Sequence, residues 1–185
     1  TGDPSWRWDA LLPLFRRHED HWRGTDALHG AGGEWRVERQ RLSWEILDAF
    51  AAAAREAGIP ATEDFNRGDN EGVGYFEVNQ RRGVRWNATK AFLRPVERRP
   101  NLTVWTGAQV TRVLVERGEA GPRVSGVELR RQGQTLRVAA TTEVVMAAGA
   151  IGTPQILQLS GIGPAALLQQ HGIAVQHELP GVGEN

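Results

Sequence analysis

Cysteine is absent from the 185 residues of this sequence. Disulfides, thiolate metal sites and cysteine nucleophiles are therefore excluded. Net charge is absent too, because 22 basic residues balance 22 acidic ones. Nucleic-acid binding needs a basic surface, and the charges here are interleaved along the chain, so we expect no nucleic-acid partner. No run approaches the roughly 20 apolar residues of a membrane helix, so we expect no membrane span.

Methionine is scarce as well. It occurs once, as Met146, and the first residue is Thr1. Translation normally starts at methionine, and the last residues, "LPGVGEN", stop without a closing element. We therefore expect an internal segment of a longer polypeptide, cut at both ends. Nothing resembles a signal peptide, and a cytoplasmic location is the expectation.

The composition that remains is that of a globular protein, with 40% apolar and 24% charged residues. Seven tryptophans are many for this length, and we expect them to pack in a core or at an interface. The apolar spacing over 6–20 predicts an amphipathic helix that Pro13 kinks or divides into two short pieces. A second helix is predicted over 44–56, with Ser43 as its N-cap and Gly58 at its end.

The second half of the chain is richer in β-branched residues. Residues 101–116 predict two short strands or one bent strand, and 123–147 predicts further strands with a hairpin turn at Gln132-Gly133. The last of these, 144–147, reads as a buried strand. A short helix with Pro164 in its first turn is expected to end at Gly172. We therefore expect a mixed α+β or α/β fold, divided near Pro100 into a helix- and loop-rich part, 1–100, and a strand-dominated part, 101–185.

A corner of small residues follows the expected strand in "VVMAAGAIGTPQILQLSGIG". Ala147, Ala148 and Gly149 carry almost no side chain, so another backbone or a flat ligand can approach there. Thr153 can cap the next helix and Pro154 suits its first turn, and the start of a helix attracts anions. The residues alone leave two interpretations open, close packing at a strand-to-helix corner and a ligand site.

The same stretch resembles the second signature of the glucose–methanol–choline (GMC) family of flavin oxidoreductases. Gly149, Thr153, Pro154 and the run Ser-Gly-Ile-Gly at 160–163 fall in its register. The resemblance covers essentially the whole chain: "LHGAGGEWRV", "DFNRGDNEGVGYFEVNQRRGVRWNATKAFLRP" and "LPGVGEN" are similar to other family segments. The choline-dehydrogenase-like and alcohol-dehydrogenase-like members are the most similar in character.

This resemblance implies part of an FAD-dependent enzyme that oxidises a small-molecule alcohol to an aldehyde or ketone by hydride transfer to the flavin. It implies a partial antiparallel-sheet substrate domain over 1–100 and a partial FAD-binding domain over 101–185. By position, the backbone of Val110 would contact the adenine, and Ala147, Ala148 and Gly149 would line the adenosine–pyrophosphate side. The electron acceptor would be oxygen or a quinone-like molecule.

Parts of the family pattern are missing. The Gly-x-Gly-x-x-Gly phosphate loop does not occur, and the family's catalytic histidine would lie beyond Asn185. We therefore assign no catalytic residue and expect the segment alone to be inactive. A non-catalytic binding or interaction module derived from the family is the alternative. Ser160-Gly161 lacks the Gly-x-Ser-x-Gly elbow of a hydrolase.

The five histidines are expected to have structural roles or to be exposed to solvent. His18 and His21 should be solvent-exposed at the end of the first helix, and His29 should at most shape the glycine-rich loop. His171 suits a helix C-terminus, and His177 alternates with apolar residues in a short strand. On a helix, His18 and His21 would not converge with Glu19 and Asp20 on a metal, so we expect no metal site.

Overall fold

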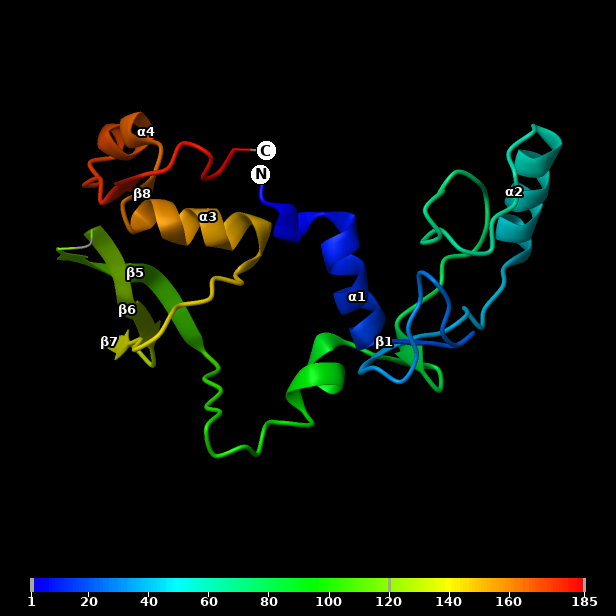
Figure 1. Ribbon diagram of the computed structural model, residues 1–185, viewed down its shortest axis with the longest axis horizontal. Coiled ribbons are helices and arrows are strands. Elements are labelled where there is room, and N and C mark those ends of the chain that lie inside the picture. The colour runs from blue at the N-terminus through cyan, green and yellow to red at the C-terminus, as the bar shows by residue number, and fades with distance from the viewer. Residues whose placement is uncertain (1, 120, 185) are drawn as a thin grey trace. The chain divides into compact units, whose positions relative to one another are not determined.

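The computed structural model describes residues 2–119 and 121–184 (Figure 1). The chain divides into two compact units, Thr1–Thr103 and Val104–Asn185, here called unit 1 and unit 2. The helices in the described part of the chain are all too short or too polar to cross a membrane.

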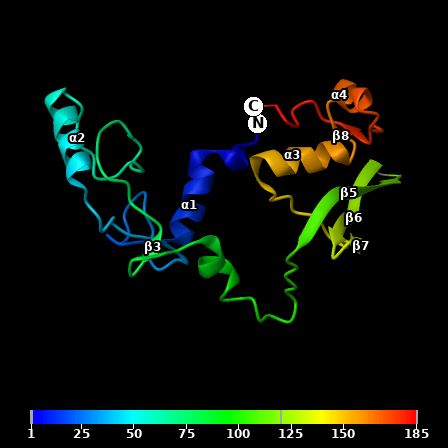
Figure 2. The same cartoon turned by 180° about the vertical axis from the view of Figure 1, so that it is seen from behind.

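Unit 1 contains short helices and small sheets joined by long loops (Figures 1 and 2). The strands β1 and β2 pair in parallel, and β3 and β4 form an antiparallel hairpin. Its elements in chain order are η1 (Pro4–Trp6), α1 (Trp8–His18), β1 (Glu19–His21), β2 (Trp35–Val37), α2 (Glu45–Glu56), β3 (Gln80–Arg81), β4 (Val84–Arg85) and η2 (Thr89–Leu93).

The first predicted helix is shorter than expected. Its start is a separate 3-10 turn, and α1 ends at His18 because the next residue, Glu19, already belongs to β1. Pro13 lies inside α1 without ending it. It lacks only its own N–H, so the helix loses one hydrogen bond there.

The second predicted helix is confirmed as α2, but its cap is not Ser43. The N-cap is Trp44, which makes no side-chain cap bond, because the helix starts one residue later than a Ser43 cap requires. The end is as predicted. Gly58 has φ +90°, and the N–H groups of Gly58 and Ile59 donate to the carbonyls of Arg55 and Ala54. This is a Schellman motif.

The centre of unit 1 is polar. Among its described residues, Ala91 is the one apolar side chain that is fully buried, whereas His21, His29 and Asp64 are buried polar side chains. Most tryptophans of unit 1 do not supply a core either, since Trp6, Trp8, Trp22 and Trp44 are all at least 40% exposed. Polar groups therefore take the place that apolar side chains have in most domains.

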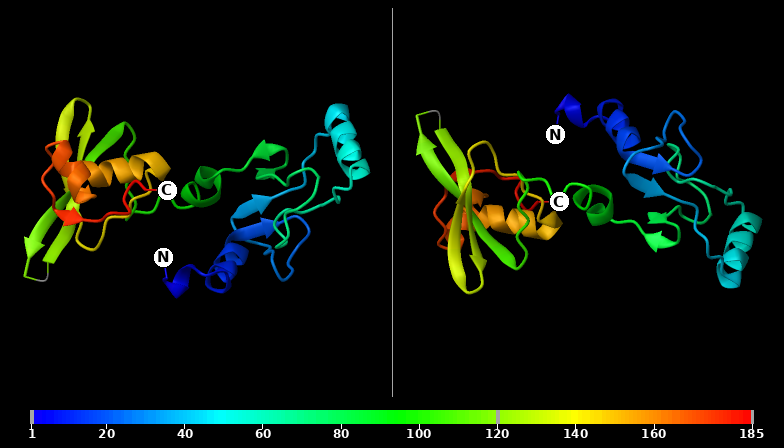
Figure 3. Two further views of the ribbon diagram at one scale, coloured as in Figure 1. Left: turned by 90° about the horizontal axis from the view of Figure 1, so that it is seen from above. Right: turned by 90° about the horizontal axis from the view of Figure 1, so that it is seen from below.

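Unit 2 has an antiparallel sheet of three strands in the order β5-β6-β7, with α3 packed against β5 (Figures 1 and 3). Its buried apolar side chains include Val113, Leu129, Ile156 and Leu168. Its elements are β5 (Ala108–Gly118), β6 (Gly121–Arg131), β7 (Gln134–Ala139), α3 (Gly149–Leu159), β8 (Ile162–Gly163), α4 (Ala165–Gln170) and β9 (His177–Glu178).

Local signals predicted much of this unit correctly. The bent strand is β5, whose pairing with β6 shifts register at two bulges. Gln132 and Gly133 both have positive φ, at 50° and 76°, as a two-residue type I′ hairpin turn requires. Gly172, with φ +69°, ends α4 as predicted.

The buried strand predicted over 144–147 is wrong. These residues form no strand, and Val145 is 78% exposed. A strand is held by a hydrogen-bonded neighbour, and no strand among the described residues pairs with this segment. It is a connection between β7 and α3.

Candidate functional site

The small-residue corner is the start of α3. The helix begins at Gly149, about one turn earlier than predicted, and Ala148 is its N-cap. The prediction that Thr153 caps the helix is therefore wrong, since Thr153 lies inside it. The Thr153 Oγ1 instead reaches back and accepts the Ala148 N–H at 3.0 Å. Pro154 consequently lies in the second turn of α3.

The corner is open on its outer side. Residues 147–151 are all exposed, and a Cβ added to Gly149, whose φ is +84°, would meet nothing within 4 Å. Ala148 uses its N–H on Thr153, so the free donors of the first turn begin at Gly149. These donors and the positive end of the helix dipole favour an anionic group at this place.

Val110 lies on β5, which forms one edge of the sheet. The residue is half-buried, pairs with Leu129 and precedes a bulge between Val110 and Arg112. In Figures 1 and 3 the first residues of β5 and the first turn of α3 lie at the same end of unit 2. The structure thus brings the two predicted contact segments to one end of one unit.

The second half of the signature, Ser160 to Gly163, is structural. Ser160 is buried and bonds both α3 and β5. A Cβ on Gly161, at φ +81°, would overlap the Ala174 carbonyl oxygen. The Gly161 carbonyl accepts the N–H groups of Gln176 and His177. Sequence reasoning missed these roles, although a glycine between two structured segments was a usable signal.

The cavities of unit 2 lie elsewhere. One of about 390 Å³ is lined by residues of β5, by Leu159 to Gly161 at the C-terminal end of α3, and by the segment from Ile173 to Gln176. Val110 and 147–149 are not among its lining residues. The corner is therefore an open surface rather than a pocket, and any ligand there would lie against unit 2 rather than inside it.

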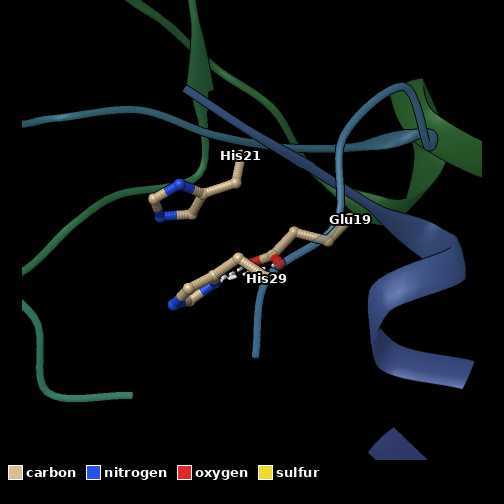
Figure 4. A group of neighbouring side chains, drawn as sticks. All are labelled: Glu19, His21 and His29. Carbon is tan, nitrogen blue, oxygen red and sulfur yellow. Dashed lines mark hydrogen bonds and ion pairs between the residues drawn. The ribbon is translucent and has the colours of Figure 1, made fainter. Parts of the chain in front are cut away.

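A second candidate site is the buried polar cluster of unit 1 (Figure 4). The expectation that His21 is exposed is wrong, because the residue is only 2% exposed. Glu19 to His21 is a strand rather than the end of a helix, and this turns the His21 side chain inward. His29 does more than shape its loop, as it is 4% exposed and bonded on both sides of its ring.

Each imidazole in this cluster faces carboxylates. The His29 Nδ1 lies 3.0 Å from the Glu19 Oε2, and its Nε2 lies 3.0 Å from the Asp64 Oδ2. Only the imidazolium form can donate from both nitrogens. The His21 Nδ1 accepts the Arg23 N–H at 3.3 Å, and its Nε2 lies 2.8 Å from the Glu77 Oε2. This arrangement fits a neutral His21 with its proton on Nε2.

The cluster contains possible metal ligands, but its geometry favours a network of ion pairs. The candidate sets are Glu19, His21 and His29, and His21, Asp64 and Glu77. The two imidazole rings lie with their centroids 4.1 Å apart and their planes tilted by 31°, and their nitrogens are bonded to carboxylates or to the Arg23 N–H. Arg23 pairs with both Asp64 and Glu77 and already supplies a cation there.

This cluster could not be found by local sequence reasoning. Its bonded pairs His29–Asp64 and His21–Glu77 are separated by 35 and 56 residues. No short spacing or periodicity connects them. The glycine-rich loop contributes through close approach, because a Cβ on Gly30 would overlap the Arg16 backbone.

Comparison with known proteins identifies the family. The family model described as GMC oxidoreductase matches residues 1–185. The chain belongs to the GMC oxidoreductase family. It is 41% identical over 187 residues to the oxygen-dependent choline dehydrogenase of Photobacterium profundum, covering 100% of this chain and 32% of that protein. It is 40% identical over 190 residues to the chloroplastic fatty acid photodecarboxylase of Chlamydomonas reinhardtii, covering 100% and 31%.

A solved structure of this family resembles the chain closely. An FAD-dependent oxidoreductase from Chaetomium thermophilum aligns with a TM-score of 0.87 and 30% identity, covering 100% of this chain and 34% of that one. The mixed helix-and-sheet structure is thus a partial GMC fold. The chain spans about a third of the length of the curated relatives it matches.

FAD is the cofactor of this family of oxidoreductases. The corner of unit 2 suits part of such a dinucleotide, because small exposed residues allow close approach and the start of α3 offers N–H donors. The cluster of unit 1 does not, since its donors and acceptors are buried and bonded to one another.

Proposed function

We propose that the longer protein containing this GMC chain oxidises a small-molecule alcohol to an aldehyde or ketone. FAD, when bound, supplies the acceptor for the hydride removed from the alcohol carbon. The observation that carries this proposal is the family match over residues 1–185, together with 41% identity to a choline dehydrogenase. Oxygen or a quinone-like molecule is proposed as the final electron acceptor, and the cytoplasm as the location.

Unit 2 is the proposed FAD-contacting part. We assign the adenine contact to the Val110 backbone on β5 and the adenosine–pyrophosphate side to Ala147, Ala148 and Gly149. The exposure of 147–149, the open space beside Gly149 and the start of α3 support this assignment. The segment 101–185 is accordingly proposed as a partial FAD-binding domain and 1–100 as a partial substrate domain.

The segment alone is proposed to bind FAD weakly and to turn nothing over. Dinucleotide affinity comes from many prearranged contacts, and the chain has no Gly-x-Gly-x-x-Gly phosphate loop. No catalytic role is assigned to any of the five histidines. His21 and His29 are committed to carboxylates in unit 1.

The test is an FAD titration of the 185-residue chain, followed by flavin absorbance and protein fluorescence. Saturable binding in the micromolar range is expected. Gly149→Ala should weaken it, because a Cβ at φ +84° strains the backbone by about 1–2 kcal/mol and shifts the corner. Gly172→Ala is the matched control, since Gly172 also has positive φ and open space around it but ends α4.

The outcomes separate the proposals. Weaker binding by Gly149→Ala alone supports the corner as the contact surface. Equal effects of both substitutions would show that the corner is not the site. A folded chain that binds no FAD at all would overturn the FAD assignment for this segment alone and leave the function to the longer protein.

A second candidate reaction rests on the 40% identity to a fatty acid photodecarboxylase. The full-length FAD-bound protein should therefore be assayed with choline and simple alcohols in the dark, and with a fatty acid under illumination. Aldehyde formation in the dark supports the proposed alcohol oxidation. Loss of carbon dioxide from the fatty acid only in light would replace it with the second candidate.

A further inference from the structure

Ser160 connects the two segments to which FAD contacts are assigned. It is 8% exposed, at the C-terminal end of α3. Its Oγ accepts the Val113 N–H at 2.9 Å and donates to the Ile156 carbonyl at 2.6 Å. One hydroxyl thus joins the backbone of β5 to the last turn of α3.

The hydrogen bond from Val113 to Ser160 satisfies a backbone donor at the edge of the sheet. Val113 is only 3% exposed, and its N–H points to the side of β5 that carries no neighbouring strand in the described sheet. A buried N–H without an acceptor lowers the equilibrium constant for folding about 5- to 150-fold. Ser160 supplies that acceptor from the neighbouring helix.

The hydrogen bond between Val113 and Ser160 lies a short distance along the chain from both segments that are assigned to FAD. Val110 lies three residues before Val113 on β5, about 10 Å at the usual rise of a strand. Gly149 lies eleven residues before Ser160 on α3, about 16 Å at the usual rise of a helix. The start of β5 and the start of α3 lie at the same end of unit 2 (Figures 1 and 3). A shift at Ser160 would therefore move one segment relative to the other.

We propose that Ser160 is a positioning residue, which holds the start of β5 and the start of α3 in the arrangement that receives the adenosine end of FAD. This inference rests on the function proposed above. Apolar contact between α3 and β5 is not directional and specifies the register of the helix along the strand less sharply than a hydrogen bond does. The hydrogen bond from Val113 to Ser160 fixes that register.

The experiment compares two substitutions in the same helix. Ser160→Ala removes the link to β5. The control, Gln158→Ala, removes a different α3 hydrogen bond, from the Gln158 Nε2 to the Val182 carbonyl at 3.1 Å, and leaves the link intact. Two quantities are measured on the 185-residue chain: amide hydrogen exchange of Val113 without FAD, and the FAD dissociation constant.

The expected effects follow from leaving the buried Val113 N–H without an acceptor, which corresponds to about a 5- to 150-fold change in an equilibrium constant. Ser160→Ala should speed Val113 exchange and weaken FAD binding by about that factor. Gln158→Ala should change neither. Ser160→Cys keeps the shape with a weaker acceptor, and should show the same effects in a smaller degree even if the alanine variant does not fold.

Two results would overturn the inference. Unchanged Val113 exchange in Ser160→Ala would show that the link does not hold β5, whatever the wild-type chain does with FAD. Equal weakening of FAD binding by Ser160→Ala and Gln158→Ala would show that general destabilisation is the cause. Failure of the wild-type chain to bind FAD is a separate result that counts against the proposed function, because the exchange measurement is made without FAD.

Discussion

Asp64→Asn is expected to destabilise unit 1 strongly. The Asp64 side chain is 2% exposed. Its Oδ2 lies 3.0 Å from the His29 Nε2 and accepts a hydrogen bond from the Arg23 guanidinium. The neutral amide removes the charge that balances the Arg23 guanidinium and lies against the His29 imidazole. Removal of one partner from a buried ion pair costs about 3–5 kcal/mol. Because His29 keeps Glu19 and Arg23 keeps Glu77, we expect the lower end, about 3 kcal/mol.

The assay is urea unfolding followed by tryptophan fluorescence. Of the seven tryptophans, six lie before residue 104, so the signal reports mainly on unit 1. Asp26→Asn is the matched control, because Asp26 pairs with Arg67 at the surface, with both side chains more than a third exposed. Surface pairs contribute about 0–1 kcal/mol. If Asp64→Asn costs no more than Asp26→Asn, the buried network does not hold unit 1 together.

Two further predictions concern charge and exposed apolar surface. Hydrogen bonds from the Arg112 side chain are the largest cause that lowers the pKa of Glu128. The stabilisation that this pair contributes should be present above the ordinary glutamate pKa and be lost as the pH falls through the lowered pKa. Glu128→Gln should therefore make the unfolding midpoint depend less on pH on the acid side. An unchanged pH profile would contradict this. The exposed face of α2 includes Ile46 at 70% and Phe50 at 68% exposure. Such a face promotes association, so Phe50→Glu should lower the mass measured by light scattering at high concentration, and identical masses would contradict this reasoning.

The predictability of the fold follows the range of the interactions. The hairpin at Gln132-Gly133 and the ends of α2 and α4 at Gly58 and Gly172 depend on backbone conformations that glycine favours, and these were predicted from neighbouring residues. The strand expected over 144–147 depended on a partner strand. Its apolar sequence alone could not supply one.

The candidate sites divide in the same way. The corner at 147–149 was visible as a run of small residues, although the start of α3 at Gly149 rather than after Thr153 was not. The start of α3 at Gly149 goes with a positive φ at that residue. A glycine allows this conformation, but its presence in the sequence does not require it. The cluster around His21 and His29 was missed because helix periodicity was extended past His18 into a strand.

The signature stretch combines two demands on the same helix. Under the proposed FAD contact its first residues must leave space, and the side of Gly149 is open. Its last residues must fix the helix, and Ser160 and Gly161 do so through bonds to β5 and to the segment before β9. A helix whose side-chain hydrogen bonds to its neighbours lie at its C-terminal end keeps its N-terminal donors free for a ligand. The alternation of small, apolar and Ser-Gly residues in this stretch therefore follows from one helix that is fixed at one end and exposed at the other.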